Sequence, residues 1–430
     1  MVVAQGHIRW AWLALTLLGV VACGGSARPK DAGHEAGYSD GGRDAADDAV
    51  DATALDAPAD TFDAQPDVVE VGHVQQVLVA TGTYHSCMVN RAGRTYCCGT
   101  NADGQLGAAA LSIAMVPSLA TGIAETDVAV LVAGHKHNCA ATSYGKPTCW
   151  GQNTYGQLGN DSLVSSPTAV VVTGLSDIVS LAAGLAFSCA ANRSGVAFCW
   201  GQNTLGQLGN DSTIDTKVPV AVSGLGDAIA LAAGAQHACA LQRGGTVVCW
   251  GDNRSGQLGN DAYVPSSKPV AVVGLSDATA IAAGIYHTCA ATSTGKAVCW
   301  GSNYSGLLGD GTMNPSAVPV AVSGLNGVIA VAADGGYFTC ALRDAGDVYC
   351  WGGDGYGELG NGVLNVSSMV PVAVVGLTNA IAISASDEHT CVVTREDEIF
   401  CWGWNVYGEL GNNASAGSGV AVPVKAMLPP

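Results

Sequence analysis

The chain has 430 residues, of which 48% are hydrophobic and only 12% are charged, and its formal net charge is −18. This length is enough for one large domain or for two to three ordinary ones, and the low charge allows a large buried core. The 58 glycines favour many tight turns and an all-β fold over a helical one. The acidic balance argues against nucleic acid and anionic membrane surfaces as partners of the folded part.

The first residues predict an export signal. Arg9 precedes an apolar run from Trp10 to Ala22, and these 13 residues are too few to span a bilayer. The run ends in Val20-Val21-Ala22-Cys23, which resembles the bacterial lipobox, where small residues precede a cysteine that receives a diacylglyceryl group. We therefore predict a lipoprotein signal peptide over residues 1–22, with lipid attachment at Cys23 and display on the bacterial envelope, in the outer membrane or at the cell surface. The alternative is an ordinary signal peptide with an incidental cysteine.

Residues 23–67 predict a disordered tether. Residues 24–67 hold ten Asp and eleven Ala, and their net charge is −8. So few large apolar residues cannot repay the entropy of folding, and the like charges repel one another. A metal-binding role is the alternative, but the spacing of the aspartates is irregular.

From about residue 68 to residue 430 the chain repeats itself seven times. The segment from Cys239 to Asp261, which contains Cys249-Trp250-Gly251-Asp252-Asn253 and Gly256-Gln257-Leu258-Gly259, shows the pattern. The first cysteines of successive copies lie at 87, 139, 189, 239, 289, 340 and 391, so the period is 50 to 52 residues. Internal repeats of this length are typical of propeller blades.

Each copy predicts four short strands between glycine turns. In the fourth copy these are Val218–Val222, Ala228–Ala233, Ala238–Gln242 and Thr246–Trp250. Short strands without a helical period indicate antiparallel sheet, and four per repeat match a blade. We therefore predict an all-β, seven-bladed β-propeller of four-stranded antiparallel blades; an open solenoid is the structural alternative.

The two ends of the repeat region suggest how the ring closes. The first copy lacks a good match to Val218–Val222, and the last copy ends with such a strand, Val422–Ala426. We expect this C-terminal strand to complete the first blade and so to remove free sheet edges, with Asp67–Val71 as the competing segment.

The repeated phrases resemble a known family. Gly284-Ile-Tyr-His287-Thr-Cys-Ala, Cys299-Trp300-Gly301-Ser-Asn303 and Gly256-Gln-Leu-Gly259 are similar to the repeats of the regulator of chromosome condensation family. The resemblance implies a seven-bladed propeller used for binding. The eukaryotic founder of that family promotes nucleotide exchange on a small nuclear GTPase, and its secreted bacterial relatives include an inhibitor that clamps a β-lactamase. The export signal and the paired cysteines set this chain apart from the founder.

Fourteen of the sixteen cysteines form pairs ten residues apart, each flanking a glycine turn. If each hairpin is symmetric, the two cysteines face each other with Cα atoms about 4.5 Å apart, near the lower limit for a disulfide. Export would bring the chain into an oxidising compartment, which favours seven disulfides over buried thiols or metal sites. Cys98 is the odd one and lies where the other copies carry a tryptophan. The predicted pairs are Cys87–Cys97, Cys139–Cys149, Cys189–Cys199, Cys239–Cys249, Cys289–Cys299, Cys340–Cys350 and Cys391–Cys401.

Other repeated residues are interpreted as scaffold. Five copies carry a histidine two residues before the first cysteine, namely His85, His137, His237, His287 and His389, whereas Phe187 and Phe338 fill this position in the other two. A catalytic or metal role would not need five copies, so we expect buried, hydrogen-bonded histidines. The Gly-Asn-Asp segments at 159–161, 209–211 and 259–261 fit turns better than calcium sites. We expect no metal and no cofactor.

Function should therefore lie where the copies differ. The loop after each Trp-Gly carries Asp103 in copy one, and aromatic residues at Tyr155, Tyr356, Trp404 and Tyr407 in copies two, six and seven, which are neighbours in a closed ring together with copy one. Exposed tyrosine and tryptophan are frequent at binding hot spots; scattered surface aromatics are the alternative.

These observations favour a monomeric, non-catalytic propeller that binds a protein or glycan partner and meets the membrane only through its lipid anchor. The alternatives are an inhibitor of an extracellular enzyme, a nucleotide exchange factor, which export argues against, and a propeller enzyme. An enzyme would require a non-repeated polar cluster at the central channel, and the sequence locates none.

Overall fold

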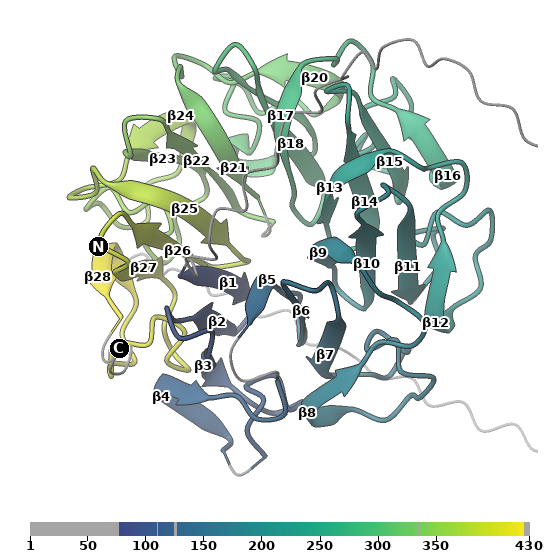
Figure 1. The fold of residues 1–430 in the computed structure, drawn as a ribbon. Helices are drawn as coiled ribbons and strands as arrows, with labels where there is room; N and C mark the ends of the chain where they lie inside the picture. The colour runs from purple at the N-terminus through teal and green to yellow at the C-terminus, as the bar shows by residue number, and fades with distance from the viewer. Residues whose placement is uncertain (1–76, 110, 124–126, 334–335, 425–430) are drawn as a thin grey trace, which may run out of the picture. The chain divides into compact units, whose positions relative to one another are not determined.

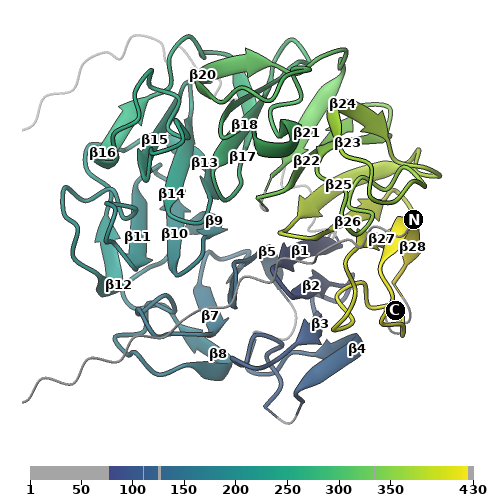
Figure 2. The same cartoon turned by 180° about the vertical axis from the view of Figure 1, so that it is seen from behind.

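Seven four-stranded antiparallel sheets form a closed ring in the computed structural model of the chain (Figure 1, Figure 2). The structure describes residues 77–109, 111–123, 127–333 and 336–424. In every blade the first strand lines the centre of the ring and the fourth lies at its outer rim (Figure 1). The prediction of a seven-bladed, all-β propeller is confirmed. The predicted signal peptide and tether, residues 1–22 and 23–67, lie outside the described residues.

Each blade takes four consecutive strands of the chain. Blades one to four are β1 (Leu78–Gly82), β2 (His85–Val89), β3 (Thr95–Thr100) and β4 (Ile113–Leu119); β5 (Val128–Ala133), β6 (His137–Thr142), β7 (Pro147–Gly151) and β8 (Ser166–Val171); β9 (Ile178–Ala183), β10 (Phe187–Asn192), β11 (Ala197–Gly201) and β12 (Thr216–Ala221); and β13 (Ala228–Ala233), β14 (His237–Gln242), β15 (Val247–Gly251) and β16 (Ser266–Ala271). Blades five to seven are β17 (Ala278–Ala283), β18 (His287–Thr292), β19 (Ala297–Gly301) and β20 (Ser316–Ala321), with the short 3₁₀ helix η1 (Tyr304–Gly306); β21 (Val328–Ala332), β22 (Phe338–Arg343), β23 (Val348–Gly352) and β24 (Ser368–Ala373); and β25 (Ala380–Ala385), β26 (His389–Thr394), β27 (Ile399–Gly403) and β28 (Ser418–Pro423).

The predicted closure of the ring by a shared blade is wrong. The strand expected at Val218–Val222 is β12, and it pairs with β11 of the preceding blade rather than opening the next one. By the same rule β28 pairs with β27, so the C-terminal strand completes the seventh blade and not the first. The first blade has its own fourth strand, β4, so it needs neither Val422–Ala426 nor Asp67–Val71, which lies outside the described residues.

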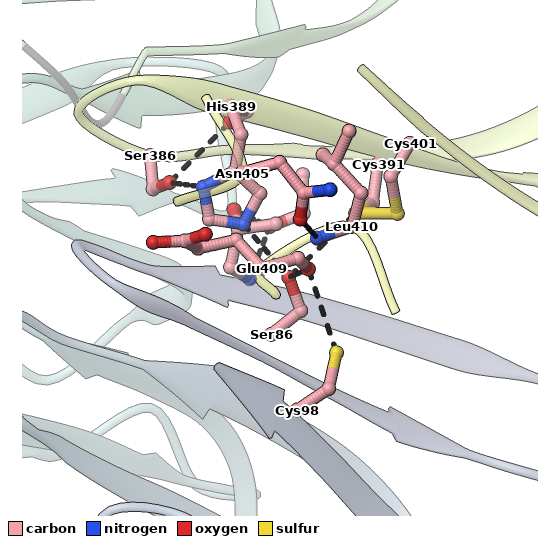
Figure 3. The surroundings of a disulfide bond; sticks show 11 residues. Ser86, Cys98, Ser386, His389, Cys391, Cys401, Asn405, Glu409 and Leu410 are labelled. Carbon is pink, nitrogen blue, oxygen red and sulfur yellow. Dashed lines mark hydrogen bonds between the residues drawn. A yellow bond between two sulfur atoms is a disulfide. The ribbon is translucent and has the colours of Figure 1, made fainter. Parts of the chain in front are cut away.

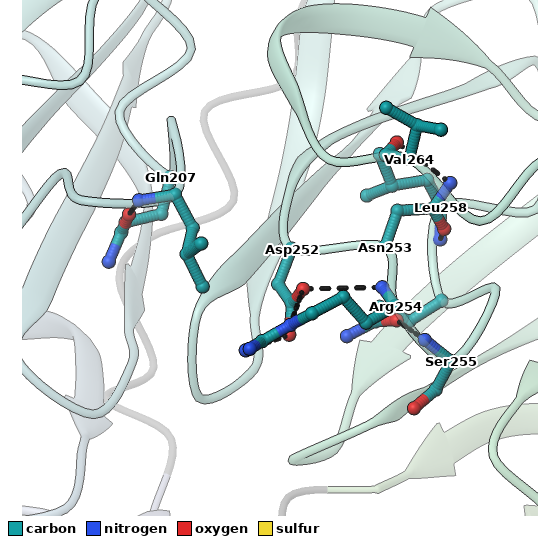
Figure 4. A network of polar contacts seen from close by, with 9 residues as sticks. Gln207, Asp252, Asn253, Arg254, Ser255, Leu258 and Val264 are labelled. Carbon is teal, nitrogen blue, oxygen red and sulfur yellow. Dashed lines mark hydrogen bonds and ion pairs between the residues drawn. The ribbon is translucent and has the colours of Figure 1, made fainter.

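An asparagine in six of the seven long loops, replaced by Asp354 in the sixth blade, explains this pairing. The Asn253 side chain donates from Nδ2 to the carbonyls of Ala262 and Val264, at 2.9 and 3.2 Å, and accepts from the Leu258 amide at 2.9 Å. These bonds hold both sides of the loop between β15 and β16 (Figure 4). Because the loop is ordered, the chain folds back onto the sheet it has just left.

The hydrophobic core lies between blades. Each tryptophan after the second cysteine is fully buried and packs with the leucine of the Gly-x-Leu-Gly segment of the preceding blade, as Trp250 does with Leu208. The indole also donates a hydrogen bond from Nε1 to the carbonyl just before that leucine, 2.9 Å from Trp250 to Gln207. Gly209 must be glycine, because its φ is +65° and a Cβ there would lie 2.8 Å from the Trp250 ring.

The buried histidines link neighbouring blades. His137 contacts Ser188 of the next blade through Nε2 at 2.8 Å, and the Ser188 hydroxyl donates to the Gln157 carbonyl at 2.9 Å. Since the serine donates to the carbonyl, the imidazole Nε2–H donates to the serine. Similar contacts from Nε2 start at the other four histidines, as expected for hydrogen-bonded core residues: His85, His237, His287 and His389.

The same contacts close the ring between the seventh and first blades. Ser86 contacts His389 Nε2 at 2.7 Å and donates to the Glu409 carbonyl at 2.8 Å (Figure 3). Cys98 takes the place of the tryptophan and donates from Sγ to the same carbonyl at 3.4 Å. The unpaired cysteine therefore lies buried in a structural position.

The structure brings all seven predicted cysteine pairs to disulfide distance. Within each pair the two cysteines stand directly opposite each other on the second and third strands, as in the register of Cys189 with Cys199. Their Cα atoms are 4.0–4.1 Å apart, somewhat closer than the separation expected from the sequence. A covalent link inside every blade would stiffen the hairpin on which the next blade packs.

Candidate binding face

One end of the ring carries most of the irregular chain. In each antiparallel blade the turn between strands one and two and the loop between strands three and four lie at the same end, and we call this end the long-loop face. Backbone bonds join the two segments, as from the Asp252 amide to the Gln236 carbonyl at 2.9 Å. The turn between strands two and three belongs to the opposite end.

Exposed tyrosines gather on the long-loop face. Among the described residues, one exposed tyrosine, Tyr144, lies in a turn at the opposite end and is 84% exposed. The others lie in loops of the long-loop face: Tyr155, Tyr263, Tyr286, Tyr304, Tyr337, Tyr356 and Tyr407. These seven tyrosines belong to the second, fourth, fifth, sixth and seventh blades.

The structure brings two of the four predicted aromatic residues into contact between the sixth and seventh blades. The rings of Tyr356 and Trp404 meet edge to face with centroids 4.2 Å apart. Tyr407 makes a similar edge contact with Tyr84 of the first blade at 5.7 Å. Tyr155 is exposed in the second blade and takes part in neither pair. Tyr84 was missed, although it lies directly before His85, where the other copies carry Lys, Ala, Gln, Tyr or Glu.

The loop residue Asp103 of the first blade has a structural partner. Its carboxylate pairs with Lys136 at 3.3 Å and accepts from the Gln152 side chain at 3.3 Å. Asp103 therefore ties the first blade to the second.

Five carboxylates that the sequence analysis missed lie in the loops of the sixth and seventh blades. Glu358 and Glu409 replace the glutamine of Gly-Gln-Leu-Gly, and Asp354 replaces the loop asparagine of the sixth copy. The other two belong to the turn between β25 and β26. The signal was in the sequence, because each of the first three residues interrupts an otherwise repeated motif. The five residues are Asp354, Glu358, Asp387, Glu388 and Glu409.

These glutamates keep the structural role of the glutamine they replace. Glu409 accepts the Tyr407 amide at 3.0 Å and Glu358 accepts the Tyr356 amide at 2.7 Å, as Gln257 does for the Ser255 amide at 2.9 Å. The loop geometry is therefore preserved while a charge is added.

Burial raises the pKa of all five carboxylates, and neighbouring charges add to this for three of them. Burial, together with the nearby charge of Glu388, raises the pKa of both Glu358 and Glu409 to about 7. Burial also raises the pKa of Asp354, of Asp387 and of Glu388 itself, the last with a contribution from the charge of Asp387. The loops of the sixth and seventh blades therefore hold more negative charge than nearby basic side chains neutralise.

The central channel itself is apolar. The first strands of the seven blades enclose a cavity of about 280 Å³ lined by Ala, Val, Leu and Ile, with Thr81 and Ser384 as its polar side chains, bonded to each other at 2.9 Å. A smaller pocket of about 100 Å³ opens on the long-loop face, and its polar side chains are Thr83, His135 and Asp387. The sequence does not show which loops reach the mouth of the channel, so these three side chains could not be located there from the sequence.

The Gly-Asn-Asp loops form turns. Asn160 accepts a hydrogen bond from Asn153 inside its own loop, and Asp161 has a φ of +61°, a conformation that Asn and Asp tolerate. Asp161 pairs with Lys217 and Asp211 with Lys268 of the following strands. Within the described ranges no group of three or more His, Cys, Asp or Glu could hold a metal ion.

The described residues contain no helix long and apolar enough to cross a membrane. Cys23 lies outside these residues, so its predicted lipidation stays a prediction.

The fold and the inter-blade motif define a class of repeat propellers. The family model of the RCC1-like domain matches residues 114–428, and the chain therefore belongs to the RCC1-like domain family.

Curated relatives match only a short part of the chain. The probable E3 ubiquitin-protein ligase HERC4 of Rattus norvegicus is 36% identical over 83 residues, and the E3 ubiquitin-protein ligase HERC2 of Homo sapiens is 33% identical over 89 residues. The matches span 19% and 20% of this chain but only 8% and 2% of those proteins. They support the repeat and say nothing about ligase activity here.

Solved structures agree with the fold. The structure of Kap60 bound to yeast RCC1 (Prp20) matches with a TM-score of 0.69 and 20% identity, covering 83% of this chain and 86% of that one. The structure of human WBSCR16 matches with a TM-score of 0.68 and 22% identity, covering 77% and 94%. At this level of identity the likeness shows the architecture alone.

Proposed function

We propose that this chain is a non-catalytic binding propeller that recognises a protein or glycan partner through the long-loop face of its sixth, seventh and first blades. One observation carries the proposal. The aromatic pairs Tyr356–Trp404 and Tyr84–Tyr407 and the five carboxylates break the repeat within the same sector. Residues that leave the scaffold unchanged but differ from copy to copy are those expected to recognise a ligand.

A binding role fits the acidic residues better than catalysis does. Glu358 and Glu409 are 3% and 0% exposed, and each accepts a backbone amide that holds its own loop. A general acid or base must reach the proton that it transfers. The aromatic rings, by contrast, are reachable: Tyr356 and Tyr407 are 47% and 37% exposed.

We further propose that the propeller is exported and displayed as a monomer on the bacterial envelope. Seven cysteine pairs at disulfide distance suit an oxidising compartment. A lipid on Cys23 and the acidic tether of residues 23–67 would then hold the binding face away from the membrane. The Cys23→Ser variant tests the anchor by detergent phase separation: the wild type should enter the detergent phase and the variant the aqueous phase, and equal partition would contradict lipidation.

The binding face is tested by capture from an envelope extract. Immobilised wild-type propeller should retain a partner that the variant Tyr155→Ala/Tyr356→Ala/Trp404→Ala/Tyr407→Ala loses. Truncating a hot-spot aromatic costs about 2 kcal/mol or more, or roughly a thirtyfold loss of affinity. Equal capture by both proteins would move the site to the opposite face or to the channel.

A further inference from the structure

The carboxylates of the sixth and seventh blades lack a cation. The described residues form six ion pairs, and none of them includes Asp354, Glu358, Asp387, Glu388 or Glu409. Elsewhere on the long-loop face four aspartates have basic partners, as Asp252 has in Arg254 at 2.8 Å. In the sector that carries the aromatic pairs none of the five carboxylates has one.

Glu409 is the group whose charge is least compensated. Its side chain is fully buried; one carboxylate oxygen, Oε2, accepts the Tyr407 amide, and the other, Oε1, has no partner within the described residues. The carboxylate points away from Cys98 and lies on the side of Ser386, where the turn carrying Asp387 and Glu388 begins (Figure 3). A buried carboxylate without a partner is costly, and a cation brought by a ligand would recover that cost.

Glu388 connects the carboxylates to the aromatic rings. Its backbone carbonyl accepts the Trp404 amide at 2.8 Å. After burial, its charge contributes to the raised pKa of Tyr84, of Glu358 and of Glu409. The indole Nε1 of Trp404 is also buried without a partner. Aromatic rings beside carboxylates are the environment that guanidinium and ammonium groups prefer.

We propose that the surface formed by Glu388 and the rings of Tyr84, Tyr356, Trp404 and Tyr407 accepts an arginine or lysine side chain of a protein partner. This inference rests on the proposed function and names the chemistry of its partner. A neutral glycan would leave Glu388 without a cation. A basic side chain would pair with the half-buried Glu388 and cover the rings, and its charge would act through space on the buried Glu358 and Glu409.

The groups around this surface make cation binding depend on pH. After burial, the charges of Asp354 and Glu388 raise the pKa of Glu358, and the charge of Glu388 raises that of Glu409. The Asp387 carboxylate accepts the Thr83 hydroxyl at 2.8 Å, and burial raises the pKa of Tyr84, so its hydroxyl is neutral at neutral pH. Below them, burial lowers the pKa of His389 to about 3 and raises that of Cys98 to about 12, so neither carries charge. Since a cation favours the ionised glutamates, affinity should rise with pH up to about 7–8.

The repeat offers matched variants for the test. Four other copies carry glutamine at the position of Glu358 and Glu409, and the fourth copy carries Gln236 at the position of Glu388. The variant Glu358→Gln/Glu388→Gln/Glu409→Gln should therefore preserve the loops. The control, Asp161→Asn/Asp211→Asn/Asp261→Asn, removes three charges from exposed loops of blades two to four, at positions with positive φ that asparagine tolerates.

The probe is a fluorescent tetra-arginine peptide, with tetra-citrulline as its neutral counterpart, measured by anisotropy at pH 8 and at pH 5.5. We expect the glutamine variant to lose about tenfold or more in affinity and to lose the pH dependence, with a change of less than about threefold in the control. Equal losses in the two variants, or no preference for arginine over citrulline, would overturn the inference. If the captured partner still depended on Trp404 and Tyr407, the binding face would stand without the cation site.

Discussion

The seam between the third and fourth blades and the seam between the seventh and first are built on one plan and differ in charge (Figure 3, Figure 4). In both, a buried side chain of the later blade donates to a loop carbonyl of the earlier one: Trp250 to Gln207 at 2.9 Å, and Cys98 to Glu409 at 3.4 Å. The backbone path of the loop is therefore conserved where the side chains are not.

The pKa of the carboxylate is lowered in one of the two loops and raised in the other. Burial acts to raise the pKa of Asp252, but the hydrogen bonds and charge of Arg254 outweigh it and lower that pKa below its usual value. Glu409 has no such cation, and burial raises its pKa to about 7. The repeated residues thus stabilise the ring, and a few substitutions in loops of unchanged backbone path add uncompensated negative charge to the sixth and seventh blades.

The largest effect on the repeated framework should come from reducing the cysteine pairs. Each disulfide closes a loop of about eleven residues, worth roughly 2–3 kcal/mol, so seven together contribute about 14–21 kcal/mol, which reaches or exceeds the stability of a typical domain, about 5–15 kcal/mol. We expect the reduced protein to unfold at ambient temperature. Thiol titration of the unfolded, unreduced chain should find about one reactive group, Cys98, and a count near fifteen would contradict the pairing.

Acid should weaken the framework next. Burial lowers the pKa of the five histidines to about 3 or 4, whereas in the unfolded chain they titrate near 6.5. Below about pH 6.5 the unfolded chain binds more protons than the folded one, so the free energy of unfolding falls as pH falls. The third and sixth copies carry phenylalanine at this position. Replacing one histidine by phenylalanine should remove the contribution of that histidine to the pH dependence of the free energy of unfolding.

His287→Phe is the variant for this test. Its free energy of unfolding should change between pH 7 and pH 5 by about 2 kcal/mol less than that of the wild type, as measured by denaturant titration. The exposed neighbour Tyr286→Phe should behave as the wild type. An unaltered pH dependence in His287→Phe would show that the histidines are not neutral in the folded protein.

The divergent sector should respond to pH in the opposite sense. The pKa of Glu358 and Glu409 is raised in the folded state, so the free energy of unfolding falls as pH rises from about 4.5 to about 7. Glu358→Gln/Glu409→Gln should therefore be more stable than the wild type at pH 8, by up to about 3 kcal/mol for each glutamate, and about equal to it at pH 4. Lower stability of the variant at pH 8 would mean that an unrecognised cation neutralises the glutamates.

The period of the repeat was enough to predict the blades, because strand length, turn glycines and cysteine spacing are local properties. The partner of the fourth strand was not local. β12 lies six residues before β13 but fourteen after β11, so its closeness in sequence favoured the wrong sheet. The bonds of Asn203 across the long loop decide the pairing, and they are visible only in the folded chain.

For a related reason, the sequence predicted the aromatic residues of the candidate site but not its carboxylates. Tyr356, Trp404 and Tyr407 stand out by type, whereas Glu358 and Glu409 differ from glutamine by one atom and the loss of neutrality. Their importance comes from burial and from the approach of Glu388, which belongs to another turn. In the sequence, both glutamates are visible only as substitutions within a repeated motif.

The central claim is that the divergent sector of the long-loop face binds the partner while the repeated sector supports it. Its most direct test compares the affinity of the captured partner for Trp404→Ala/Tyr407→Ala and for Tyr263→Ala/Tyr304→Ala, exposed tyrosines of the fourth and fifth blades, with Tm recorded for both. The account predicts a loss of about thirtyfold or more in the first variant and less than about twofold in the second, at unchanged Tm. Equal losses, or a loss only in the second, would contradict it.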